Sequence, residues 1–74
     1  MARVEVRTEM AGTVKELLVA VGDPAAEAQE LLILESMKME VPVESPATGR
    51  VAELCVEAGA VIAEGDLLLV LEAG

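Results

Sequence analysis

Hydrophobic and polar positions alternate along much of the chain with the period of β-strands. Residues 3–7 read Arg-Val-Glu-Val-Arg, and residues 39–44 read Met-Glu-Val-Pro-Val-Glu, so each segment carries its valines on one face. Residues 31–34 form a continuous aliphatic run that is short enough for a buried strand. Residues 21–24 and 45–49 contain the Gly and Pro of turns. The pattern predicts an all-β fold, a small sandwich or flattened barrel of short strands.

The second half of the chain repeats the first at an offset of 37 residues. Residues 12–35 align without a gap with residues 49–72, and twelve of these 24 positions are identical. The identical residues of the first half are Gly12, Val14, Glu16, Leu17, Val19, Gly22, Ala26, Glu27, Leu31, Leu32, Leu34 and Glu35. Repeats of this kind determine the architecture. We therefore expect one domain over residues 1–74, with halves at about 12–35 and 49–72 related by a pseudo-two-fold axis.

Residues 24–32 favour a helix by local propensity, since they include the run Ala-Ala-Glu-Ala-Gln-Glu. Their counterpart at residues 61–66 in the second half is not helical in character. The repeat therefore favours strand and turn over helix in this segment.

Composition removes several classes of function. The chain has no histidine and one cysteine, so it lacks the commonest general base and cannot form a zinc site or an internal disulfide. Autonomous catalysis is not expected. A net charge of −9 disfavours nucleic acid as a partner. No apolar run is long enough to span a membrane, and no signal-peptide core is present, so a soluble, cytoplasmic protein is expected.

The sequence Glu35-Ser36-Met37-Lys38-Met39-Glu40 joins the two halves and interrupts the repeat. The strand pattern predicts a hairpin at about residues 36–40, with Met37 and Lys38 as its two-residue turn. Such turns favour Asn-Gly or Asp-Gly, so Met-Lys is a poor choice for folding. Residues that violate local turn chemistry often serve function. We expect a primary amine at the tip of a rigid scaffold, flanked by methionines that suit a binding surface.

An ordinary solvated lysine is the alternative interpretation of Lys38, because short motifs often arise by chance. Its position at the joint of the repeat favours a functional role. Lys15, the second of the chain's two lysines, is predicted to lie within a strand and aligns with Ala52.

The chain resembles the biotinyl/lipoyl attachment domain family, and its short free-standing members of the biotin carboxyl carrier type in particular. The hexapeptide is similar to the family's Glu-Ala-Met-Lys-Met motif, with Ser36 in place of alanine. Residues 21–23, 29–31, 42–43, 46, 49–51 and 64–68 also match the family pattern, so the resemblance covers essentially the whole chain. It implies a flattened β-barrel of two four-stranded antiparallel sheets with biotin on Lys38.

This resemblance implies a carrier rather than an enzyme. A biotin protein ligase would attach biotin to Lys38, with Met37 and Met39 as recognition contacts for ligase and carboxylase. Glu35 and Glu40 would orient the hairpin through basic residues of the ligase. The attached group would then carry a carboxyl group from a biotin carboxylase to a carboxyltransferase that acts on an acyl-CoA or on pyruvate. The domain itself is expected to be monomeric.

Two other functions remain open on sequence grounds. One is a lipoyl carrier, or a protein that accepts both biotin and lipoate. A lipoyl carrier usually has an acidic residue before its lysine and alanine after it, which the two methionines disfavour. A structural barrel-sandwich domain would carry a helical hairpin between its halves, and residues 36–48 show no helical pattern.

The sequence departs from the family at Ala28, where the family and Gly65 of the second half have glycine. If that backbone position needs a positive φ, Ala28 is strained. The chain also lacks the protruding thumb insertion of some acetyl-CoA carboxylase carriers.

Overall fold

The computed structural model describes residues 2–73, which form eight strands in two four-stranded antiparallel sheets. The strands are β1 (Ala2–Arg7), β2 (Gly12–Leu17), β3 (Pro24–Ala25), β4 (Glu30–Ser36), β5 (Met39–Glu44), β6 (Gly49–Leu54), β7 (Val61–Ile62) and β8 (Leu67–Ala73). One sheet has the order β1-β8-β6-β3, and the other has the order β5-β4-β2-β7. The expected all-β fold of two four-stranded sheets is confirmed.

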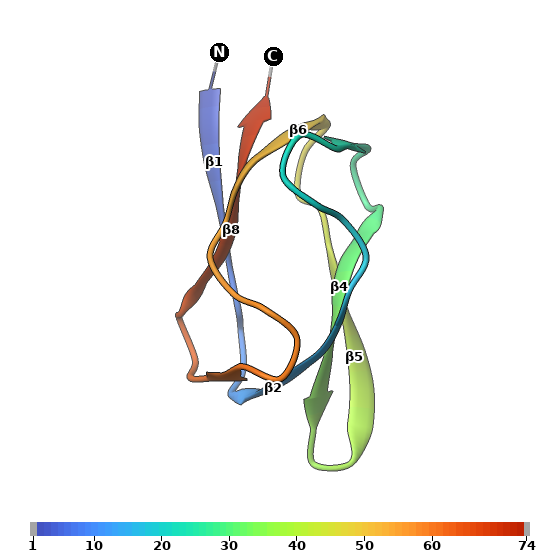
Figure 1. Cartoon of the computed structure of the whole chain (residues 1–74), viewed down its shortest axis with the longest axis vertical. Coiled ribbons are helices and arrows are strands. Elements are labelled where there is room, and N and C mark those ends of the chain that lie inside the picture. Colours follow the sequence, from blue (N-terminus) through green and yellow to red (C-terminus); the bar gives the residue numbers. More distant parts are fainter. Residues whose placement is uncertain (1, 74) are drawn as a thin grey trace.

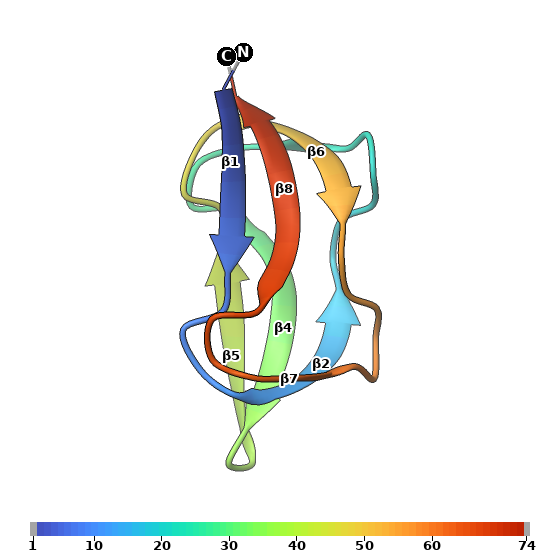
Figure 2. The ribbon, with the colours of Figure 1, turned by 90° about the vertical axis from the view of Figure 1, so that its left-hand side faces the viewer.

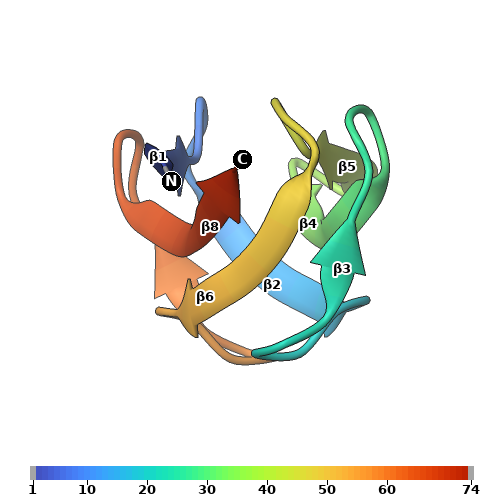
Figure 3. The ribbon, with the colours of Figure 1, turned by 90° about the horizontal axis from the view of Figure 1, so that it is seen from above.

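The two sheets face each other and form an elongated body with extents of 36 × 18 × 17 Å (Figure 3). The hairpin that joins β4 to β5 projects from one end of the long axis, as Figure 1 shows. The outer ends of β1 and β8 lie at the opposite end in both side views (Figures 1 and 2). The hairpin is therefore the most protruding feature at its end of the molecule.

Every strand has a counterpart 37 residues along the chain. Strand β1 corresponds to β5, β2 to β6, β3 to β7 and β4 to β8, with identical lengths and offsets. The sheet orders correspond in the same way, since β5-β4-β2-β7 converts into β1-β8-β6-β3 under this pairing. The structural correspondence also includes β1 and β5, which lie outside the segments that align by identity. It is preserved there by the shared valines at 4/41 and 6/43.

The core is wholly aliphatic. Its buried residues are Val6, Val14, Val19, Ala25, Leu31, Leu32, Leu34, Val51, Ile62, Leu68, Leu69, Val70 and Leu71. The two leucine-rich runs fall in β4 and β8, each of which has a strand on both sides. Continuous apolar runs are typical of strands that are buried on both faces. These two strands therefore hold the sheets together.

Two buried hydroxyl groups occupy positions related by the pseudo-two-fold symmetry. Thr8 and its counterpart Ser45 are both 3% exposed, and each donates a 2.6 Å hydrogen bond to the carbonyl oxygen two residues later. Those carbonyls belong to Met10 and Ala47. Burial of a hydroxyl without such a partner would destabilise the fold. Both hydroxyls thus stabilise the loops that follow β1 and β5.

The helix that local propensity suggests over residues 24–32 does not form. This segment instead contains β3, a turn, and the start of β4. Pairing of Pro24 and Ala25 with β6, and of residues 30–36 with β2 and β5, outweighs the weak local preference. Pro42, which has no backbone N–H to donate, lies in β5 at the edge of its sheet. Residues 2–73 contain no helix that could span a membrane.

Four tight turns share one conformation, and three of them use glycine where it is required. In each, the third residue has a positive φ: Gly22 (95°), Ala28 (71°), Gly59 (92°) and Gly65 (89°). The fourth residue of each donates its N–H to the first residue's carbonyl at 3.0 Å, and the second residue has a negative φ, which defines a type II turn. Ala28 is the exception to glycine at this position, so the strain that the sequence analysis anticipated is present.

Ala28→Gly should therefore stabilise the protein by up to about 1 kcal/mol, because glycine adopts a positive φ without the Cβ penalty. For a chain of this size, that gain corresponds to a rise in Tm of up to about 4–8 °C. Thermal unfolding followed by circular dichroism would measure it. Gly65→Ala, at the symmetry-related turn, is the matched control and should lower Tm. An unchanged or lower Tm for Ala28→Gly would contradict the assignment of strain.

Candidate functional site

The hairpin between β4 and β5 closes with a two-residue turn. Ser36 pairs with Met39 in the last rung of the ladder, which leaves Met37 and Lys38 as the turn residues. Their φ angles are 53° and 67°. Two consecutive positive φ values in a two-residue hairpin define a type I′ turn, which is normally occupied by Asn-Gly. The turn predicted from the sequence is therefore present, although neither methionine nor lysine favours the positive φ that it requires.

Side chains at the hairpin tip are turned toward solvent. Met37 is 92% exposed and Met39 is 63% exposed, and Lys38 between them is also exposed. Within residues 2–73, the ammonium group of Lys38 forms no ion pair. Exposed methionines are unusual and suit adaptable contacts with a partner protein. The tip thus combines a free primary amine with two soft apolar side chains.

Strand β2 supports the base of the hairpin from one side. A Cβ atom on Gly12 would lie 2.6 Å from the carbonyl oxygen of Glu35 and 3.5 Å from the Cβ of Ser36. No larger residue fits there without moving the backbone of β4 just before the turn. Ser36 is half-buried, whereas Glu35 is exposed on the outer face of the sheet. The hairpin therefore leaves the core in a fixed direction.

Glu40 has a partner within the chain. Its carboxylate forms a hydrogen-bonded ion pair with the ammonium group of Lys15 in β2. The family resemblance implies that Glu40 faces basic residues of a ligase, and the sequence alone gives no sign of its contact with Lys15. The pair reaches across β4, which β2 and β5 flank in the same sheet.

The pKa of Lys15 lies above the usual value of 10.5, chiefly because the Glu40 carboxylate accepts its hydrogen bond and attracts its charge. Glu35 and Glu16 add smaller attractions, and desolvation opposes them. The ion pair therefore favours the charged form of Lys15 close to the β4–β5 hairpin.

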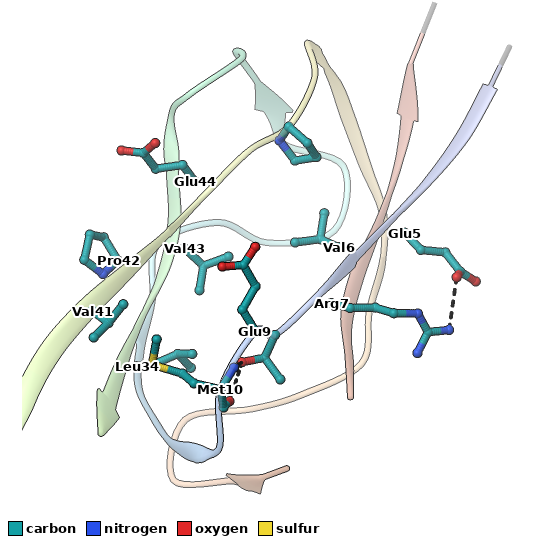
Figure 4. A pocket seen from close by; sticks show the side chains of 12 residues that line it. Glu5, Val6, Arg7, Glu9, Met10, Leu34, Val41, Pro42, Val43 and Glu44 are labelled. Carbon is teal, nitrogen blue, oxygen red and sulfur yellow. Dashed lines mark hydrogen bonds and ion pairs between the residues drawn. The ribbon is translucent and has the colours of Figure 1, made fainter. Parts of the chain in front are cut away.

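A groove of about 430 Å³ lies between β1 and β5, the edge strands of the two sheets. Figure 4 shows Val6, Val41 and Val43 among its apolar side chains. Glu5 and Arg7 form an ion pair at its rim. None of the residues from Glu35 to Glu40 lines this groove. The site at the hairpin tip is thus a protrusion that lies apart from this groove.

Residues 2–73 contain no group of three or more Asp, Glu or Cys side chains arranged to hold a metal ion. A lysine amine, exposed and flanked by methionines, is suited instead to covalent attachment of a group through an amide bond.

Comparison with known proteins agrees with this chemistry. A family model described as "Biotin-requiring enzyme", of the biotin/lipoyl type, matches residues 4–71. The chain belongs to this family. The resemblance inferred from the hexapeptide and the repeat is confirmed, and so is biotin as the expected cofactor type.

Two curated relatives are homologues of the biotinylated protein TB7.3. The homologue from Mycolicibacterium smegmatis is 49% identical over 39 residues, which are 53% of this chain and 55% of the relative. The homologue from Mycobacterium leprae is 46% identical over the same shares. The aligned region thus spans about half the length of these relatives.

Solved structures of carboxylases contain regions with the same fold. A single-chain, multi-domain long-chain acyl-CoA carboxylase superposes with a TM-score of 0.91 at 32% identity, over 97% of this chain and 7% of that one. The urea carboxylase of Kluyveromyces lactis gives a TM-score of 0.90 at 26% identity, over 97% of this chain and 6% of that one. The biotin/lipoyl domain described here thus corresponds to a small part of each enzyme.

The type I′ turn yields a stability prediction. A left-handed conformation costs a non-glycine residue roughly 1–2 kcal/mol, and asparagine tolerates it better than methionine. Met37→Asn should raise the free energy of unfolding by roughly 0.5–1 kcal/mol in urea denaturation, as part of that cost is relieved. Met39→Asn is the control, because Met39 lies in β5 and has no positive φ, and it should not stabilise. A Met37→Asn protein no more stable than wild type would contradict strain at the turn.

Proposed function

We propose that this chain is a biotin carboxyl carrier that holds biotin in an amide bond to Nζ of Lys38. The observation that carries the proposal is the exposed, unpaired amine of Lys38 at the tip of a strained hairpin, between Met37 and Met39. Membership of the biotin-requiring family and the names of the two curated relatives support the choice of group.

Each residue of the hairpin has a proposed task. Lys38 supplies the nucleophilic nitrogen, while Met37 and Met39 provide the apolar contacts by which a biotin protein ligase and a biotin carboxylase recognise the tip. Ser36 and Glu35 form the end of β4, which Gly12 approaches closely, so they orient the turn. Glu40 is the second residue of the return strand β5 and pairs with Lys15.

The chain is proposed to act as a carrier without catalytic groups of its own. It has no histidine, and its groove between β1 and β5 is not lined by the hairpin. Biotin, when bound, supplies the nitrogen that accepts a carboxyl group. The domain contributes a rigid mount and a tether, which raises the effective concentration of the group at each partner's active site.

The proposed partners are a biotin protein ligase, a biotin carboxylase and a carboxyltransferase. The structural match to a long-chain acyl-CoA carboxylase favours an acyl-CoA as carboxyl acceptor over pyruvate. The match to part of a urea carboxylase supports another acceptor as the alternative. The monomeric state and the cytoplasmic location remain predictions from the sequence.

The intact mass of the chain after co-expression with a biotin ligase tests the proposal. Wild type and Lys15→Arg should both gain one biotin, whereas Lys38→Arg should gain none and remain folded, since its side chain is exposed. Biotin on Lys38→Arg would place the site elsewhere. A folded wild-type chain that gains no biotin would refute the carrier function.

A lipoyl carrier is the second candidate, because the family includes both modifications. Met37→Asp with Met39→Ala places the residues preferred in lipoyl domains around Lys38. With both ligases present, this variant should lose most biotin and gain lipoate, as measured by the ratio of the two mass increments. Unchanged biotinylation would show that the methionines do not select the cofactor, and lipoate on the wild-type chain would favour the lipoyl function.

A further inference from the structure

The chain has two lysines, and both lie near the same end of one sheet. Lys38 occupies the β4–β5 turn, and Lys15 lies in β2 where the register to β4 shifts. From there, the Lys15 side chain reaches over β4 to the carboxylate of Glu40 in β5. The Lys15 side chain is 47% exposed, so solvent access alone does not protect its amine from modification.

The opposite sheet contains a related ion pair with the charges reversed. Arg3 of β1 contacts Glu53 of β6 at 2.5 Å, across the intervening strand β8. Arg3 is the counterpart of Glu40, and Glu53 is the counterpart of Glu16, the neighbour of Lys15. Both pairs join an edge strand to the strand beyond its neighbour. A purely structural role would therefore be shared by both pairs, which makes the Arg3–Glu53 pair a natural control.

The two pairs differ in chemistry. A guanidinium such as that of Arg3 does not react with acyl donors at neutral pH. An unpaired lysine does react, through the small fraction that is deprotonated. Three carboxylates attract the charge of Lys15: Glu40 in β5, Glu35 in the adjacent strand β4, and Glu16 in its own strand β2. Each of them favours the charged, unreactive ammonium form.

We propose that Glu40 is a specificity residue that keeps Lys15 from being acylated, so that Lys38 is the side-chain amine of this domain that reacts. The proposal rests on the proposed function of Lys38 as the attachment site. Glu40 acts on Lys15 through the ion pair and needs no contact with the acyl donor. It thereby performs a task in addition to any part it has in recognition of the hairpin.

The reaction that Glu40 suppresses is ordinary amide formation. The lone pair of a neutral amine attacks the carbonyl carbon of an activated acyl group, the nitrogen–carbon bond forms, and the bond from that carbon to the leaving oxygen breaks. The nitrogen then releases its proton to the buffer. An ammonium group has no lone pair available, so the rate is proportional to the neutral fraction of the amine.

Competitive labelling without a ligase tests this directly. Wild type and Glu40→Gln are treated with a limiting N-hydroxysuccinimide ester of biotin at several pH values, and labels are located by mass spectrometry. Cleavage after glutamate separates Lys15 (residues 10–16) from Lys38 (residues 36–40, or 36–44 in the variant). The α-amino group is measured on its own peptide. Glu40→Gln should increase labelling of Lys15 relative to Lys38, by about tenfold for each unit by which the Lys15 pKa falls.

The pH profile distinguishes electrostatic suppression from simple loss of shielding. The pH at which Lys15 labelling is half-maximal should be higher in wild type than in Glu40→Gln. If Glu40 only covered the amine, its replacement would change the labelling rate of Lys15 but not this midpoint pH. Glu53→Gln breaks the Arg3 pair and should leave the Lys15 to Lys38 ratio unchanged. An unaltered Lys15 profile in Glu40→Gln, or equal labelling of both lysines in wild type, would overturn the proposal. Neither outcome depends on a ligase, so failure of the carrier function is a separate result.

Discussion

Burial of two aliphatic strands is the constraint on which the rest of the structure depends. Strands β4 and β8 each have neighbours on both sides and contribute six leucines that are almost completely buried. Complete burial of a leucine side chain stabilises the folded state by about 1.5–3 kcal/mol. In a chain without aromatic residues, these two strands are the main source of that stabilisation. Their burial fixes the position of β4, and β4 in turn directs the hairpin away from the core.

The hairpin is both anchored and exposed, because one part of β4 is buried in the core and another part extends beyond it. Leu31, Leu32 and Leu34 anchor the strand in the core, while Glu35 and Ser36 continue past it toward the turn. The type I′ turn then needs no more than two residues to reverse the chain. Met37 and Lys38 fit this turn poorly, and burial of the core offsets the free energy that their positive φ angles cost. A flexible loop could expose a lysine equally well, but it would not hold the lysine in one orientation.

Much of the fold and of the site can be predicted from this sequence, because the repeat presents most of the strands and turns twice. The alignment of residues 12–35 with residues 49–72 correctly predicts strand and turn at residues 24–32, against their helical propensity. The alternation at residues 39–44 predicts a strand, and Pro42, which has no N–H to donate, is compatible with the edge position of β5. The contact of Lys15 with Glu40 escapes such reasoning, because it depends on a diagonal crossing of β4 and on the register shift next to Lys15. Side-chain pairs across an intervening strand have no fixed separation in sequence.

The distribution of cationic residues separates structural from chemical roles. Three ion pairs are present within residues 2–73, and two of them use arginine. An arginine can join two strands without offering a nucleophile, whereas a lysine in the same role brings an amine that acyl donors can attack. The one lysine used in this way lies on the sheet that carries the β4–β5 hairpin, and three carboxylates attract its charge. A carrier that must accept one group on one nitrogen is consistent with this arrangement, in which protrusion exposes Lys38 and charge pairing restrains Lys15.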